Sequence, residues 1–357
     1  MGERVKRQEQ ESATEEITEV APGILRTQLP IALPGLGHVN CYVLEDERGI
    51  ALVDPGLPGP DSWAALMARL ASAGFKLEHV HSVVVTHSHP DHFGGAPRLQ
   101  RETGADLITH RSFKLWWDLE ADAEDPEAVA NGTAPAPVVP RAPTGHWDRP
   151  TPWGGLPFRP QMEGSSSEEL RRNLFEDMGI PRPTVRLDDA QVVRLAGREW
   201  VAVHTPGHTP DHLCLYDPVE GIVLSGDHVL PTITPHISGL GEAADPLAEF
   251  FHSLDRMDEL SGVSTVLPAH GHPFTDLHGR VDAIRTHHVG RLDKLREASG
   301  EMGRMATVNE LMQHLFSERA WGSMAESETF AHLEHLRLGG LADQTTVDGV
   351  MLYEITA

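Results

Sequence analysis

Cysteine is scarce in this sequence, which contains only Cys41 and Cys214 among its 357 residues. The two lie far apart, each within a short apolar run, so no disulfide framework is predicted and a reducing cytosol suits the chain. No stretch approaches the roughly 18 consecutive apolar residues that a membrane helix needs, and the charged N-terminus lacks the apolar core of a secretion signal. We therefore expect a soluble, cytoplasmic protein without a membrane partner.

Positive charge is also in short supply. The chain has 29 Lys and Arg against 53 Asp and Glu, a formal net charge of −24. Such a charge repels a phosphate backbone, so nucleic acid is an unlikely partner.

The pattern of apolar residues predicts an α/β fold. Residues 1–18 are polar and acidic, and we expect a disordered tail there. Short strand-like runs follow, with an amphipathic helix over residues 61–72 between the third and fourth runs. These runs occupy residues 24–27, 40–44, 50–53, 80–86, 191–195, 200–203, 213–216, 221–225 and 263–267.

Residues 113–183 interrupt this pattern. They are rich in Pro and Gly and carry Trp116, Trp117, Trp147 and Trp153. Loops of this length are usually functional lids or disordered segments, and the tryptophans favour a lid that packs over something apolar. A solvated spacer is the alternative.

From residue 280 onward the pattern becomes helical. Helices are predicted over residues 281–298, 308–316 and 327–338, followed by a strand over 350–354. This order resembles a winged-helix module, but a DNA-binding role is not implied, because the last helix carries only Arg337 as a fixed positive charge. We expect a catalytic domain over residues 19–279 and this module over 280–357, either covering one edge of the active-site face or forming a homodimer contact.

Histidine is the compositional outlier, with 22 residues, many of them in clusters. The densest cluster follows the strand at 80–86 and contains His87, His89, Asp91 and His92. On an extended turn, residues two apart can point to the same side, so His87 and His89 can share one metal ion while Asp91 and His92 face another.

Three further segments place candidate ligands just after apolar strands. His208 stands between His204 and His212, and these three compete for one ligand role. Asp227 can offer one carboxylate oxygen to each of two cations, and His270 follows the strand at 263–267. Four such segments meeting at one sheet edge predict a two-metal site.

Taken in order, the motifs at His87–His92, at Thr205–Thr209, at Ser225–Asp227 and at Pro268–Gly271 resemble those of the metallo-β-lactamase superfamily over residues 24–274. The resemblance implies a four-layer αββα sandwich. It also implies that His87, His89 and His208 hold a first metal, that Asp91, His92 and His270 hold a second, and that Asp227 bridges the two. The first site has no cysteine, unlike lactamases with a Cys ligand. His204, His212, His228 and His272 are expected to support a ligand, to face the substrate or to be structural.

Two bound cations, zinc by default and manganese or iron as alternatives, would share a hydroxide that acts as the nucleophile. Asp91 would accept a proton and return it to the leaving group. A C-terminal module of this kind resembles the branch that contains hydroxyacylglutathione hydrolase-like proteins, thioesterases of polyketide pathways and a lactamase-like endoribonuclease. We expect a small thioester or carboxylic ester substrate, of the hydroxyacylglutathione or acyl-CoA kind. The alternatives are a lactonase and an endoribonuclease with a local basic patch at Arg141, Arg149, Arg171 and Arg172.

Overall fold

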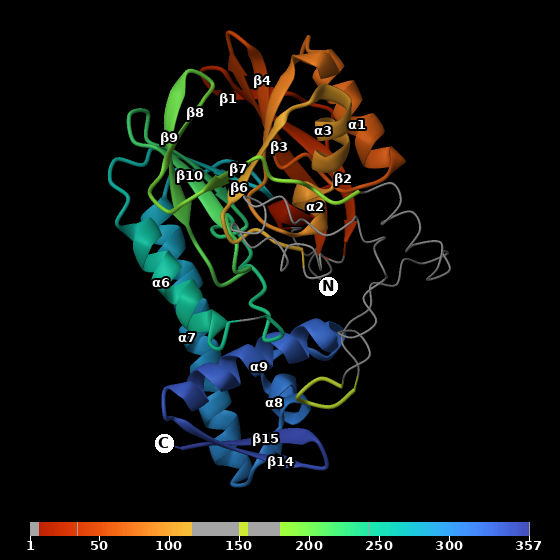
Figure 1. Ribbon diagram of the computed structural model, residues 1–357. Coiled ribbons are helices and arrows are strands. Elements are labelled where there is room, and N and C mark those ends of the chain that lie inside the picture. The colour runs from red at the N-terminus through yellow and green to blue at the C-terminus, as the bar shows by residue number, and fades with distance from the viewer. Residues whose placement is uncertain (1–6, 34, 116–149, 156–178, 242, 357) are drawn as a thin grey trace, which may run out of the picture.

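The computed structural model describes residues 7–33, 35–115, 150–155, 179–241 and 243–356. Two sheets form the centre of the catalytic part (Figure 1). The first has seven strands in chain order: β1 (Thr18–Ala21), β2 (Ile24–Leu33), β3 (Leu36–Asp46), β4 (Gly49–Val53), β5 (Val80–Val84), β6 (Asp106–His110) and β7 (Val185–Leu187). The second has five, in the order β12 (Thr265–Pro268), β11 (Ile222–Gly226), β10 (Leu213–Asp217), β9 (Arg198–His204) and β8 (Val192–Leu195).

Helices cover the outer face of each sheet. Helices α1 (Pro60–Ser72) and α3 (Ala96–Thr103) pack on the first sheet, and the short α2 (Pro90–Phe93) lies between β5 and α3 in the chain. Helices α6 (Pro246–Asp258) and α7 (Leu277–Met302) pack on the second sheet. The structure therefore confirms the predicted αββα sandwich.

Strand alternation explains why the sheets can be covered on both faces. In β4, Ile50 and Leu52 pack toward α1 and α3, whereas Ala51 and Val53 face the second sheet. Successive side chains of a strand point to opposite faces, so a strand buried on both sides is apolar along most of its length. The two cysteines follow the same rule, because Cys41 faces the helices of the first sheet and Cys214 those of the second.

The C-terminal part combines helices with a small antiparallel sheet. Helices α8 (Val308–Leu315) and α9 (Ser323–Leu338) pack on the second half of α7 and on a three-stranded sheet of order β13 (Ala306–Thr307), β15 (Val350–Ile355) and β14 (Ala342–Val347). These elements match the predicted helices and final strand, while the likeness to a winged helix stays a prediction. The expected boundary after residue 279 falls inside α7, which runs unbroken from the second sheet into this part.

Within the predicted insertion, the structure describes residues 113–115, 150–155 and 179–183. Trp116, Trp117 and Trp147 lie outside the described residues, as do Arg141, Arg149, Arg171 and Arg172. Trp153 is described and is 7% exposed; its ring lies 5.1 Å from that of Phe330 on α9. This tryptophan therefore packs into the core of the C-terminal part. Across the described segments, none of the helices is both long enough and apolar enough to cross a bilayer.

The expectation of a disordered tail over residues 1–18 is wrong for residues 7–18. A short 3₁₀ helix (Gln8–Gln10) places the fully buried carboxylate of Glu9 where it accepts hydrogen bonds from the backbone N–H groups of Thr232 and Ile233 and from the Thr232 hydroxyl. The backbone of Glu11 lies so close to Gly37 that a side chain there would collide with it. Composition alone cannot reveal such a long-range anchor.

We predict that Glu9→Ala lowers the free energy of unfolding by about 2–3 kcal/mol, because it removes the buried carboxylate that accepts hydrogen bonds from the backbone N–H groups of Thr232 and Ile233. Urea unfolding followed by circular dichroism would measure this. Glu16→Ala, at an exposed position of the same segment, should change stability by less than about 0.5 kcal/mol. Equal losses in the two variants would contradict the anchoring role.

Candidate metal centre

Four strands end at the same place, and a candidate ligand follows each of them. His87 and His89 follow β5, and α2 then carries Asp91 and His92. His208, Asp227 and His270 follow β9, β11 and β12 in the second sheet. The site therefore lies where strands of both sheets end, whereas the sequence predicted the edge of one sheet.

The first group consists of His87, His89, His208 and Asp227, whose ligand atoms all lie within 4.8 Å of one another. His89 Nδ1 is 3.0 Å from His87 Nε2 and 3.1 Å from His208 Nε2. Three ring nitrogens thus point toward one position. The structure brings these residues together as the resemblance implied.

The second group consists of Asp91, His92 and His270, whose ligand atoms meet the same limit. Asp227 lies between the two groups: its Oδ1 is 3.2 Å from His270 Nε2, and its Oδ2 is 3.6 Å from His208 Nε2. A carboxylate in this position can serve both groups. All seven expected residues are therefore in one place, although their role as ligands remains a proposal.

Four of the five histidines are oriented through the ring nitrogen that faces away from the group, namely His87, His92, His208 and His270. His208 Nδ1 donates to the carbonyl oxygen of His236 over 2.7 Å, and His270 Nδ1 donates to that of His38 over 2.6 Å. Such bonds place the proton on Nδ1 and leave the lone pair on Nε2, which is the form that binds a cation.

Asp54 orients histidines of both groups. Its Oδ2 accepts from His92 Nδ1 over 2.9 Å and from the Thr86 hydroxyl over 2.8 Å. That hydroxyl in turn accepts from His87 Nδ1. The sequence indicates a turn at Asp54 but no role for this residue, because its partners lie more than thirty positions along the chain.

The loop of His270 is held by the first sheet. Asn40 Nδ2 donates to the carbonyl oxygens of Pro268 and Gly271, and the Tyr42 hydroxyl donates to Pro268. These two side chains on β3 were also missed, since an amide and a phenol inside an apolar strand give no local indication of their distant partners.

The electrostatics of the two groups differ. Burial and the neighbouring imidazoles hold the pKa values of His87 and His89 well below the ordinary value, so both are neutral. Burial also lowers the pKa of His92, but the carboxylates of Asp91, Asp227 and Asp54 outweigh it and raise that pKa to about 10. For Asp227, burial raises the pKa, whereas His270 and His92 hold it well below the usual range.

Buried atoms without a hydrogen bond indicate where a cation would fit. Among the described residues, eleven buried side-chain N and O atoms form no hydrogen bond, and three of them belong to this centre: His92 Nε2, His270 Nε2 and Asp227 Oδ1. Unpaired buried polar atoms cost free energy, so they are rare unless something else satisfies them. These three atoms belong to adjoining members of the site, and their imidazole and carboxylate chemistry suits a divalent transition metal.

The other candidate histidines have different roles. His212 Nε2 accepts a hydrogen bond from the backbone N–H of Asp227, and its Nδ1 bonds the Thr205 hydroxyl. His212 therefore positions the backbone of Asp227. His204 stacks on His110 at 3.7 Å and bonds the carbonyl oxygen of Pro210. Of the three histidines that competed for one role, only His208 therefore joins the ligand group.

His228 and His272 lie outside the ligand groups. His228 is buried against Phe250, and burial lowers its pKa to about 3, so it is a neutral packing residue. His272 is partly exposed and pairs with Glu11 of the N-terminal segment over 2.9 Å. Its backbone N–H bonds Gln8 in the same segment.

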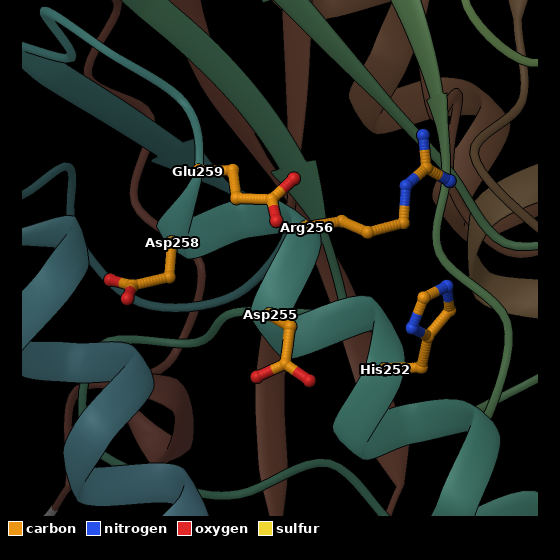
Figure 2. A pocket seen from close by; sticks show the side chains of 5 residues that line it. All are labelled: His252, Asp255, Arg256, Asp258 and Glu259. Carbon is orange, nitrogen blue, oxygen red and sulfur yellow. The ribbon is translucent and has the colours of Figure 1, made fainter.

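Two other features of the described part contain none of these seven residues. A third buried group with suitable ligand atoms, His288, Glu328 and His332, lies between α7 and α9. A surface hollow beside α6 is lined by His252, Asp255, Arg256, Asp258 and Glu259 (Figure 2). Among these residues, Arg256 donates hydrogen bonds to the Asp189 carboxylate and to the carbonyl oxygen of His204. These bonds connect α6 to the end of β9.

We predict that Asp54→Asn weakens metal binding by about 10–100-fold, because it removes the carboxylate that orients His92 and, through Thr86, His87. Titration of the metal-free protein with zinc against a chromophoric chelator measures this. Asp46→Asn is the matched control, because Asp46 also accepts a histidine hydrogen bond, from His81, but at the far end of β3. Unchanged affinity in Asp54→Asn would remove this residue from the site.

Comparison with known proteins agrees with this geometry. The model of the metallo-beta-lactamase superfamily matches residues 34–301. A probable metallo-hydrolase of Bacillus subtilis, YqjP, is 24% identical over 320 residues, which cover 86% of each chain. An atrochrysone carboxyl ACP thioesterase of Aspergillus novofumigatus, nsrC, is 26% identical over 321 residues, 86% of this chain and 75% of that protein.

A solved structure extends the likeness to nearly the whole chain. The crystal structure of a metallo-beta-lactamase family protein from Thermus thermophilus superposes with a TM-score of 0.72 and 27% identity, covering 94% of this chain and 100% of that one. The family model spans most of the chain and includes all seven residues of the candidate centre. This chain therefore belongs to the metallo-β-lactamase superfamily and is a metal-dependent hydrolase.

Proposed function

We propose that this protein is a dinuclear metal-dependent hydrolase of thioesters or related carboxylic esters. The observation that carries the proposal is the pair of adjoining ligand groups with the Asp227 carboxylate between them. Seven ligand residues without a cysteine suit zinc, and manganese or iron would accept the same mixture of imidazole and carboxylate.

When bound, the two cations would supply a water-derived nucleophile at neutral pH and stabilise the negative charge that develops on the substrate carbonyl oxygen. The protein would contribute the orientation of both groups. Asp54, His38 and His236 fix the ring positions of His92, His270 and His208. No serine or cysteine nucleophile is needed, and both cysteines are buried in the apolar clusters between the sheets and their covering helices.

Asp91 is the proposed proton carrier. It is buried at the start of α2, and its Oδ2 lies 3.5 Å from His270 Nε2 and 3.6 Å from His92 Nε2. As the water oxygen bonds to the carbonyl carbon, the water proton would pass to the Asp91 carboxylate. As the bond from carbon to sulfur or oxygen breaks, that proton would pass to the leaving group, giving a carboxylic acid and a thiol or alcohol.

Two observations support the choice of a thioester. The thioesterase nsrC aligns with this chain over 86% of its residues, and its name specifies an acyl carrier protein thioester. The net charge of −24 disfavours an RNA substrate. A lactone presents a similar carbonyl and is the nearest alternative.

We predict that Asp91→Asn keeps the fold but lowers kcat by about 10²–10⁴-fold, because an amide cannot accept and return the proton. Turnover, bound metal and thermal unfolding would be measured on the same preparation. Asp227→Ala is the comparison variant, which should lower the metal content itself. Near-wild-type turnover in Asp91→Asn would remove this residue from the mechanism.

A substrate panel tests the assignment directly. Acyl-CoA, acyl-glutathione, a lactone, a β-lactam, a phosphodiester and short single-stranded RNA would be offered to enzyme loaded with zinc, manganese or iron. We expect the highest kcat/KM for a thioester, with the reaction monitored through the free thiol that it releases. A chelator should abolish this activity. Chelator-sensitive RNA cleavage without thiol release would assign a nuclease instead, and activity unchanged by chelation would overturn the proposal as a whole.

A further inference from the structure

The segment between β11 and α6 joins the metal centre to the C-terminal part. Its residue His236 accepts the hydrogen bond from His208 Nδ1 through its backbone carbonyl, at 2.7 Å. The position of this carbonyl therefore decides which nitrogen of His208 carries the proton and where its Nε2 points. No regular helix or strand holds this carbonyl, because residues 231–241 form only bends, turns and loop.

Helix α9 holds this segment in place. The backbone N–H of Gly239 donates to both the carbonyl oxygen and the hydroxyl of Ser327, at 3.2 and 3.1 Å. The hydroxyls of Ser238 and Ser327 are 3.2 Å apart. A side chain at Gly239 would collide with Phe330 and Ser327, so the segment lies directly against the helix.

Glu328 on α9 also contacts the segment that carries His236. Its Oε2 lies 3.5 Å from Nδ1 of the His236 side chain, and its Oε1 binds Arg291 on α7. The carboxylate is almost completely buried. Burial raises the pKa of Glu328, but Arg291 and His236 outweigh burial and hold that pKa well below its ordinary value.

Two histidines complete this polar cluster. His332 Nδ1 donates to the carbonyl oxygen of Glu328 over 2.7 Å, and His332 Nε2 is 3.1 Å from His288 Nδ1. The His332 contact with His288 joins α9 to α7 about one helical turn from the contact between Glu328 and Arg291. Because Arg291 already neutralises the carboxylate, the cluster suits a rigid support better than a further cation site.

From these contacts we infer that Glu328 is a positioning residue for the metal centre: through His236 it fixes the orientation of His208. The C-terminal part would then be a component of the first metal position, which contains His208, and not of the second. This inference rests on the proposed metal centre. It goes further by assigning a role to a helix that contributes no ligand.

The test is metal binding by the full-length protein. The metal-free form would be titrated with cobalt(II) against a competing chelator, and the visible spectrum would report the ligand geometry. In wild type we expect two bound equivalents. Glu328→Gln should weaken one of them by about tenfold and change its spectrum, while the other keeps its affinity.

Two further variants make the result specific. Glu334→Gln changes a glutamate on the same helix that binds Arg337 and Tyr353, and it should leave both affinities unchanged. Ser327→Ala loosens the same segment without touching the carboxylate. It should weaken the same equivalent as Glu328→Gln, and it gives the answer if Glu328→Gln does not fold.

The outcomes separate the two proposals. Wild type that binds no cobalt would overturn the metal centre itself. Two equivalents in wild type with unchanged affinities in both Glu328→Gln and Ser327→Ala would overturn only the positioning role. Three equivalents in wild type, of which Glu328→Gln loses one completely, would also overturn it, because Glu328 would then be a ligand.

Discussion

The structure depends on placing several carboxylates and imidazoles out of water at one point. Asp54, Asp91 and Asp227 are each less than a tenth exposed, and they surround histidines that are buried as well. Isolated buried charges are too costly to persist, so they must be compensated by opposite charge. The raised pKa values of His92 and His270 show the direction of this demand, since the carboxylates favour any nearby positive charge. Cations at this point would satisfy the same demand, which links metal binding to folding.

The strand architecture favours one kind of place for such groups. A strand covered on both faces is mostly apolar, so a cluster of charged ligands is more easily accommodated by the residues just after the strand ends. Two backbone hydrogen bonds join the sheets there: Leu213 N–H donates to Thr86, and Asn40 N–H donates to Ala269. The ligand loops of the two sheets are thereby held in register, so the site rests on rigid elements rather than on the loops alone.

The residues that meet in the candidate centre could be picked out from the sequence because each one stands next to a clear local pattern, and their role as ligands stays a proposal. His87 to His92 directly follow an apolar run, and Asp227 and His270 each follow another. The residues that orient them could not be predicted, because Asp54, Asn40 and the carbonyl of His236 act across long distances in the chain. The local pattern alone left His208, His204 and His212 as alternatives, because the choice depends on which ring nitrogens are already occupied, and the family resemblance indicated His208. The N-terminal segment was wrongly expected to be disordered, because its polar composition does not reveal that the buried Glu9 carboxylate anchors it to Thr232 and Ile233.

The domain boundary raises a different physical question, namely whether the C-terminal part is a separate unit. A single apolar cluster contains Val223 on the second sheet, Phe250 on α6, Leu295 on α7 and Tyr353 on β15. Helix α7 is 26 residues long, about 39 Å at roughly 1.5 Å per residue, and it contributes to this cluster along its whole length. Cutting within α7 would expose that shared core rather than free a linker. An appended module with its own core would not restrict the residues of the metal centre. A C-terminal part that shares a core with the second sheet can restrict them, because the two pack as one body. The same packing that stabilises the C-terminal helices therefore also limits the movement of the segment that carries His236.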